Sequence, residues 1–251
     1  MIDLKSSLPL LLLAAALTLL NAPAKAANPG FQSCPQFFPG NTPRLPESTR
    51  HRVRELCFDA FAVLYSGSSK TPVYAVERLT REQLDDARDE VRSNRFYPEA
   101  RLRAAERATL ADYKGSGFDR GHMAPAADMP SAQAMAQSFS LANMVPQAPE
   151  NNRGVWAKAV EKSTRQYVKR VGRPVFIFTG PAFTNQPRTI GEGKVWVPAY
   201  LYKLVYDPQT NRAWAHWIEN SAQARAGQPI SYQELVERTG IDFLPGIKPD
   251  S

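Results

Sequence analysis

The 251-residue sequence has few of the side chains that build most metal centres and covalent catalytic sites. It contains two cysteines and three histidines, and neither cysteine has a CxxC partner or a neighbouring histidine. The HExxH, GxSxG and Walker A motifs are absent as well. A zinc peptidase, an α/β-hydrolase esterase and a P-loop nucleotide hydrolase therefore have no support in the sequence.

Long apolar runs are missing after residue 26, where no segment approaches 18 consecutive apolar residues. We therefore expect no membrane span in the mature protein. Residues 1–26 combine an early lysine, an apolar run from Leu8 to Leu20 and a small-x-small ending at Ala26. This pattern is typical of a secretory signal peptide cleaved before Ala27, with an uncleaved anchor as the alternative. It predicts a periplasmic or extracellular protein.

Acidic residues are fewer than basic ones, 24 against 31, which gives a net charge of +7. Without residues 1–26, which carry Lys5, Lys25 and Asp3, the net charge is +6. A basic exported protein is typical of one that binds a polyanion such as nucleic acid. The charge alone is equally compatible with a role in solubility.

The mature chain of 225 residues is long enough for one domain with a substantial core. Residues 28–50 are rich in Pro, Gly, Ser and Asn, so we expect residues 27–56 to form an irregular N-terminal arm. Cys34 and Cys57 are an even pair in an oxidising compartment, and we expect a disulfide between them that pins this arm. Residues 57–251 then form the domain.

The hydrophobic pattern of the domain predicts strands and helices in alternating groups. A helix from Asn151 is closed by Gly172, and a last helix begins at a capping box of Ser231 and Glu234 and ends at Gly240. One further helix is expected within residues 81–113. The predicted strands are residues 57–66, 73–80, 175–180, 195–207 and 213–220. Together these elements predict an α+β fold with a mixed, largely antiparallel sheet and flanking helices.

The three histidines differ in their surroundings. His51 lies in a polar segment near the arm and is expected at the surface, and His216 lies on one face of a predicted strand and is expected to be structural. His122 lies in SGFDRGHMAPAAD, where Arg120, together with Arg92, offers guanidinium groups to a phosphate. Adjacent arginines favour a neutral imidazole, which can accept a proton near neutral pH. The alternative is a histidine whose hydrogen bonds are satisfied within a loop.

Two motif-rich segments resemble the DNA/RNA non-specific endonuclease family, nucleases with a ββα-metal (His-Me finger) site. GSGFDRGHMAPAAD carries the DRGH tetrad at Asp119–His122, and SLANMVPQAPENNRGVW carries Asn143–Gln147 followed by Asn151–Trp156. Weaker similarities occur in RSNRF, IFTGP and ERTGIDFL. The resemblance covers most of residues 57–245 and implies a ββα-metal motif within the predicted α+β domain.

The resemblance also implies a role for each matching residue. His122 corresponds to the general base that deprotonates a water molecule, and Asn152 corresponds to the only direct protein ligand of a Mg²⁺ ion. Arg120 and Arg92 correspond to residues that neutralise charge on the phosphate, and Asn143 to one that organises the site. An amide oxygen suits Mg²⁺, which keeps several waters, and it suits Mn²⁺ as well.

Two neighbouring residues receive supporting roles. Asp119 is expected to orient the loop rather than to react, because its place before Arg120 suits an internal hydrogen bond or ion pair. The family has a glutamate eight residues after the metal-binding asparagine, where it holds a metal-bound water, but this chain has Val160 there and Glu161 one residue later. In a regular helix Glu161 lies roughly 180° from Asn152.

Three explanations for this offset remain open: a π-bulge, a later helix start, or loss of the glutamate's role. We favour a local adjustment that keeps Glu161 near the metal through a water molecule. A Glu161 side chain that points to solvent far from Asn152 would refute this interpretation.

The sequence therefore predicts an exported, Mg²⁺-dependent endonuclease that hydrolyses DNA and RNA. Little sequence preference is expected, because a metal, a base and two arginines contact only what every phosphodiester shares. The alternative is a catalytically inactive periplasmic nucleic-acid-binding protein of the same fold, and a basic adhesion protein is a third reading. The sequence specifies neither an inhibitor protein nor a homodimer.

Overall fold

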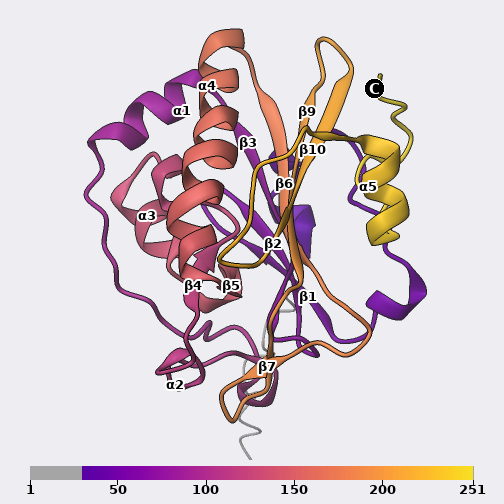
Figure 1. The fold of residues 1–251 in the computed structure, drawn as a ribbon. Coiled ribbons are helices and arrows are strands. Elements are labelled where there is room, and N and C mark those ends of the chain that lie inside the picture. The colour runs from indigo at the N-terminus through magenta and orange to yellow at the C-terminus, as the bar shows by residue number, and fades with distance from the viewer. Residues whose placement is uncertain (1–29, 251) are drawn as a thin grey trace, which may run out of the picture.

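The computed structural model describes residues 30–250, so the predicted signal peptide lies outside the described residues. A seven-stranded sheet, antiparallel throughout, forms the centre of the molecule (Figure 1). Its strands are, in order across the sheet, β1 (Val53–Cys57), β2 (Ala62–Ser66), β3 (Thr71–Leu79), β6 (Val175–Ala182), β9 (Tyr200–Asp207), β10 (Arg212–Glu219) and β11 (Ile230–Ser231).

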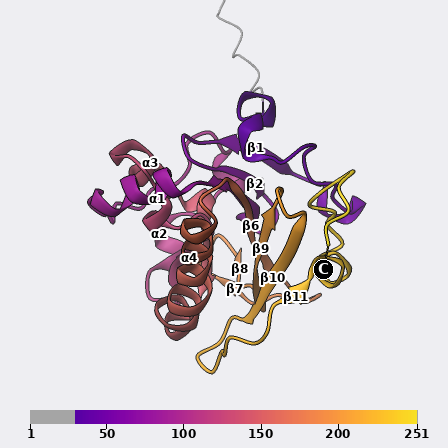
Figure 2. The same ribbon diagram turned by 90° about the horizontal axis from the view of Figure 1, so that it is seen from above.

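Helices cover both faces of this sheet, as Figures 1 and 2 show. One face carries α1 (Arg81–Asp86), α3 (Ala132–Ser138) and α4 (Lys162–Val171), and the opposite face carries α5 (Tyr232–Thr239) with the N-terminal arm. The central strands β3, β6 and β9 are buried along most of their length because both faces are covered. The α+β prediction is confirmed.

The two best-defined helix ends follow the sequence signals. Ser231 Oγ accepts a hydrogen bond from the Glu234 amide at 3.1 Å, which caps α5. Gly240 has φ of +69°, the left-handed conformation that closes a helix, and Gly172 ends α4 in the same way.

Several predicted strands and helices are divided in the structure. The strand expected at residues 57–66 is two strands, β1 and β2, joined by a turn at residues 58–61, so the last residues of the predicted arm belong to the sheet. The strand expected at 195–207 splits into β8 (Val195–Trp196) and β9, because Pro198 cannot donate to a ladder. Instead of one helix within residues 81–113, the chain forms α1 and α2 (Leu110–Tyr113).

The N-terminal arm is part of the core. Cys34 and Cys57 form the predicted disulfide, which joins the arm to the end of β1. Phe31 and Phe38 are buried and stack with Tyr74 of β3 and Phe178 of β6. No helix within residues 30–250 is long and apolar enough to cross a membrane.

Candidate active site

The DRGH segment forms a short strand, β4 (Asp119–His122), that pairs antiparallel with β5 (Met144–Gln147). A helix follows β5 and begins at Asn151. The chain therefore forms the expected ββα arrangement on the face of the sheet that carries α1, α3 and α4 (Figure 1). A Cβ atom on Gly121 would lie 2.0 Å from Gln147 Oε1. The close approach of the two strands therefore requires glycine at this position.

His122 is buried beneath two phenylalanine rings. Its ring meets Phe139 edge-on at 4.9 Å and Phe96 at 5.8 Å, and its Nε2 has no hydrogen-bond partner within residues 30–250. Burial, followed by the nearby charge of Arg92, lowers the pKa of His122 to about 3. The imidazole is therefore neutral, as a general base must be.

The expectation that Arg120 keeps His122 neutral is wrong in its cause. Burial has the larger effect on the pKa, and the arginine that contributes is Arg92. The Arg120 guanidinium instead lies over the Phe96 ring, 4.2 Å from its centroid. Arg120 and His122 are two residues apart on β4, so alternation places them on the same side of the strand, but Arg120 extends to Phe96 and is not among the causes of the lowered pKa of His122.

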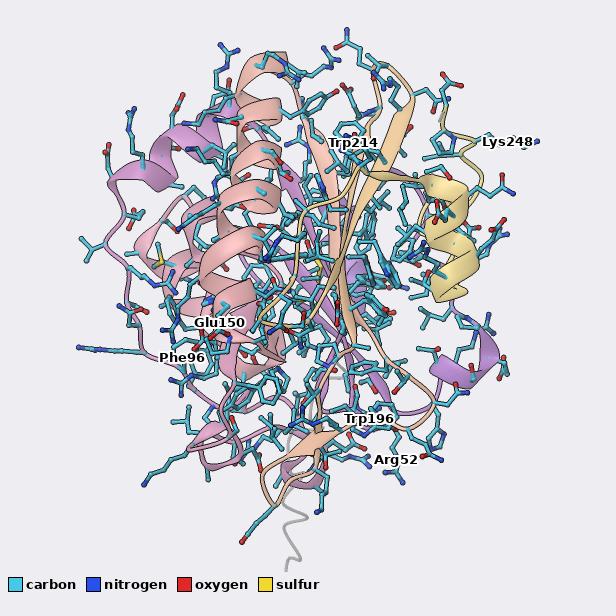
Figure 3. The ribbon with its side chains drawn as sticks, in the orientation of Figure 1. Arg52, Phe96, Glu150, Trp196, Trp214 and Lys248 are labelled. Atoms are coloured by element: carbon cyan, nitrogen blue, oxygen red, sulfur yellow. A yellow bond between two sulfur atoms is a disulfide. The ribbon has the colours of Figure 1, made fainter. Side chains whose placement is uncertain are left out.

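Both arginines line a cleft of about 300 Å³. His122 is not one of its lining residues, but its ring packs against Phe96, which is. The Arg92 guanidinium lies 5.0 Å from the Phe139 centroid, and its Nε donates to Asn94 Oδ1 at 2.8 Å. Phe96 also lines this cleft, and Figure 3 labels both Phe96 and Glu150, the residue just before the helix that follows β5. The other lining residues are Asn94, Tyr113, Phe118, Asp119, Asn152 and Arg153.

Asp119 fixes the orientation of Asn152. It accepts hydrogen bonds from Asn152 Nδ2 at 2.9 Å and Arg153 Nε at 2.8 Å. Burial raises the pKa of Asp119, but the hydrogen bonds from Arg153 and Asn152 outweigh it, so the net pKa is lowered and the carboxylate is charged. Asp119 therefore makes the internal hydrogen bonds and ion pair expected of it, and its partners are Asn152 and Arg153.

The Asn143 side chain makes hydrogen bonds to the backbone of two other segments. Its Oδ1 accepts from the Ala124 amide at 2.9 Å, and its Nδ2 donates to the carbonyl oxygens of Ala124 and Ser138. The side chain is fully buried and its amide is occupied by these contacts. Asn143 therefore holds the segment after His122 in place and is not positioned to touch a substrate.

Glu161 is turned into the protein. The helix from Asn151 to Glu161 (η8) is π-helical with a break at Gly154, and this local adjustment carries the side chain inward despite the extra residue. Only 13% of the side chain is exposed, and Arg165 Nη1 lies 3.9 Å from its carboxylate. The solvent-facing arrangement that would have refuted our interpretation is absent, while the role of Glu161 toward a metal stays a prediction.

A buried group of charges surrounds Glu161. Burial raises the pKa of Glu161 to about 7, against the opposing charges of Lys203 and Arg165. Arg165 also pairs with Asp128 at 3.1 Å, and burial raises the pKa of the neighbouring Glu77. The charge of Glu161 also acts on Arg92, which links this group to the cleft.

Sequence reasoning missed residues that reach the site only through the fold. Phe96 and Phe139 bury His122, and Arg153 holds Asp119, although Arg153 stands inside the recognised Asn-Asn-Arg-Gly motif. Lys203 belongs to a strand of the main sheet, and nothing in its local pattern marks it. His51 is exposed, as predicted. His216 stands on β10 opposite Lys203, and neither histidine lines the cleft.

The residues present fit a metal ion held by a single protein oxygen. Within residues 30–250 no group of three or more His, Cys, Asp or Glu side chains could hold a metal. Asn152 Nδ2 donates a hydrogen bond to Asp119, whereas Asn152 Oδ1 accepts none from residues 30–250. An amide oxygen of this kind suits a hard, largely hydrated divalent ion.

Comparison with known proteins decides the family. Residues 41–250 match the model of the DNA/RNA non-specific endonuclease family. The chain belongs to this family. The family is metal-dependent and its members are hydrolases that act on nucleic acids.

Several named relatives of this endonuclease family are similar to the chain. It is 30% identical over 210 residues to "Nuclease EXOG, mitochondrial" of Homo sapiens, an alignment of 75% of this chain and 56% of that protein. It is 30% identical over 218 residues to "Nuclease" of Nostoc sp., covering 76% and 73%. The chain thus spans little more than half of the human relative.

A solved structure shares the fold. The crystal structure of the EndoG/EndoGI complex aligns with a TM-score of 0.72 at 23% identity, over 87% of this chain and 92% of that chain. This likeness concerns the fold alone.

Proposed function

We propose that the protein is an exported, Mg²⁺-dependent endonuclease that hydrolyses phosphodiester bonds of DNA and RNA with low sequence specificity. The observation that carries the proposal is a buried, neutral His122 that packs against Phe96 at the edge of a cleft lined by Arg92, Arg120 and Asn152. Family membership supports nucleic acid as the substrate.

Each residue has a task in this reaction. His122 accepts a proton from the attacking water, and Arg92 and Arg120 offset the negative charge that grows on the phosphate. Asp119 holds the Asn152 amide so that Oδ1 would bind Mg²⁺ or Mn²⁺. When bound, the ion supplies Lewis-acid polarisation of the phosphate and stabilises the departing 3′ oxygen.

The cleft accounts for low specificity and for acceptance of both nucleic acids. Its arginines match the phosphodiester that every nucleotide shares, and such contacts position a strand without reading its sequence. The reaction uses no 2′-hydroxyl, so RNA and DNA are both substrates.

Export rests on the sequence of residues 1–26 and agrees with the disulfide between Cys34 and Cys57. The names of several relatives carry the word mitochondrial, so the compartment of this chain needs its own test. N-terminal sequencing of the protein recovered outside the cytoplasm should begin at Ala27. Retention of Met1 in a cytoplasmic fraction would contradict export.

The activity is tested by incubating the mature protein with supercoiled plasmid and with single-stranded RNA, in Mg²⁺ and in EDTA. We expect both substrates to be degraded in Mg²⁺ and to survive in EDTA. If both survive in Mg²⁺ while the protein still shifts DNA in a gel, the inactive binding protein is the correct reading.

A further inference from the structure

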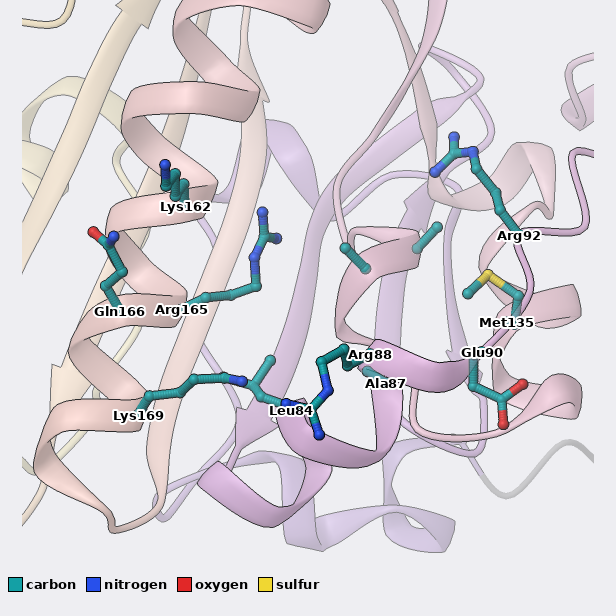
Figure 4. A pocket seen from close by; sticks show the side chains of 12 residues that line it. Leu84, Ala87, Arg88, Glu90, Arg92, Met135, Lys162, Arg165, Gln166 and Lys169 are labelled. Atoms are coloured by element: carbon teal, nitrogen blue, oxygen red, sulfur yellow. The ribbon is translucent and has the colours of Figure 1, made fainter.

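A second, larger groove lies beside the active-site cleft. It has a volume of about 450 Å³ and runs between α4 on one side and α1 with the following segment on the other (Figure 4). Its floor contains Ala126, Ala127 and Met135. Arg92 lines both this groove and the cleft beside His122, so the two hollows meet at one guanidinium.

The groove is strongly cationic. Five of its lining residues are Lys or Arg and one, Glu90, is acidic. Lys162, Arg165, Gln166 and Lys169 are spaced three or four residues apart on one face of α4, as Figure 4 shows.

Two of these cations are free to bind a ligand. Arg165 is held by Asp128 and Glu161, and Lys169 pairs with Asp85 at 2.8 Å. No ion pair of residues 30–250 involves Lys162. Arg88 is 70% exposed and meets Asp89 only at 3.7 Å, an arrangement in which water screens most of the attraction.

The dimensions suit a nucleic-acid strand. Lys169 lies seven residues after Lys162 on α4, which is about 10 Å along the helix axis. A strand lying along the groove would therefore place a few phosphates over this length, because each nucleotide carries one. The floor of small and apolar side chains leaves room for sugars between the two cationic walls.

We propose that this groove binds the phosphodiester backbone of the substrate strand on one side of the scissile bond, with Arg88 and Lys162 as its phosphate-contacting residues. The proposal rests on the proposed function, because it assigns part of the substrate to the surface next to the catalytic cleft. Arg92 then contacts the strand where it passes from the groove to His122.

The test is binding of a fluorescently labelled 20-nucleotide single-stranded DNA by the Arg88→Glu/Lys162→Glu variant in EDTA. We expect Kd to rise at least about tenfold at low salt, because two phosphate contacts are replaced by repulsion. For the Arg88→Ala/Lys162→Ala variant, the slope of log Kd against log salt should fall by roughly 1.4, since each single-strand contact contributes about 0.7. The alanine variant also keeps the test available if the glutamate variant does not fold.

The matched control is Lys248→Glu/Arg212→Glu, which changes the net charge equally. Lys248 lies on the side of the molecule away from α4 (Figure 3), and both residues are exposed near the C-terminus. The control should bind like the wild type. The groove proposal would be wrong if the two double charge reversals raised Kd equally. It would also be wrong if neither groove variant changed the binding of DNA.

A second assay separates this proposal from the proposed function. In Mg²⁺, the ratio of kcat/KM for the 20-mer to that for a trinucleotide should fall about tenfold in the groove variant. If the wild type cleaves and the groove variant shows the same ratio of kcat/KM values and the same Kd, the groove proposal is wrong and the nuclease proposal stands. If the wild type does not cleave in Mg²⁺ but binds DNA in EDTA more tightly than the groove variant, the groove proposal stands and the nuclease proposal is wrong.

Discussion

His122 shows how distant residues set the chemistry of one side chain. Phe96 and Phe139 come from separate segments and exclude water from the imidazole, and this burial lowers its pKa more than any arginine does. The sequence predicted the residue and its neutral state. It assigned the neutral state to adjacent arginines, of which only Arg92 contributes, and it missed the burial because neither phenylalanine has a pattern that places it on His122.

Because His122 is buried in its neutral form, we predict that the unfolding free energy of the protein decreases as the pH is lowered. The pKa of His122 is about 3 in the folded protein and about 6.5 in an unfolded chain, so on acidification the unfolded chain takes up this proton first. Between pH 7 and pH 5 this costs about 2 kcal/mol of unfolding free energy. Urea unfolding in EDTA should show a smaller loss for His122→Asn, and equal losses in both proteins would contradict the burial.

Asp119 gives a second prediction at this scale. Asp119→Asn removes the charged acceptor that orients the Asn152 amide, so the metal concentration for half-maximal cleavage should rise by about 10- to 100-fold. The matched control is Glu150→Gln, which removes one exposed carboxylate nearby without touching Asn152. Similar metal titration curves for the two variants would show that Asp119 does not act through Asn152.

At the scale of elements, predictability depends on length and on local signals. The helix from Asn151 and the last helix were predictable, because apolar spacing, a Ser231 cap and terminal glycines lie within their own residues. Strand β4 has four residues and no alternation, so its pairing with β5 was not visible in its pattern. The resemblance supplied the ββα motif, and the structure supplied the π-helical path that turns Glu161 inward.

The π-helical segment buries Val160, which occupies the position where the family has its glutamate. Val160 is fully buried and packs in the same core cluster as Trp156. Val160→Glu should therefore lower the unfolding free energy by roughly 3 kcal/mol or more, beyond the loss in Val160→Ala, because it buries an unpaired carboxyl group. Chemical denaturation measures both variants. A stable and more active Val160→Glu protein would show that the helix is regular.

At the scale of the molecule, the two largest of the four hydrophobic clusters within residues 30–250 lie on opposite faces of the sheet. One lies under the ββα motif and contains Trp156 and Phe139, and the other joins α5 and the N-terminal arm to the opposite face. The disulfide ties the arm to β1 in the second core, away from the cleft. The arm therefore contributes stability, while the site depends on the first core.

This division predicts that loss of the disulfide affects stability more than chemistry. The Cys34→Ser/Cys57→Ser variant should unfold about 3 kcal/mol more easily, as expected for a closed loop with a sequence separation of 23 residues. Its kcat at a temperature where it stays folded should match the wild type. Unchanged stability in urea, or a loss of kcat in the folded variant, would contradict the separation of the two cores.

The central claim is that His122 is the base of a phosphodiester-hydrolysing site. The most direct test is the rate of plasmid nicking by His122→Ala in saturating Mg²⁺, with and without added imidazole. The account predicts a fall of about 10² to 10⁴ in rate and partial recovery that follows the concentration of neutral imidazole. A His122→Ala protein that nicks plasmid at the wild-type rate would contradict it.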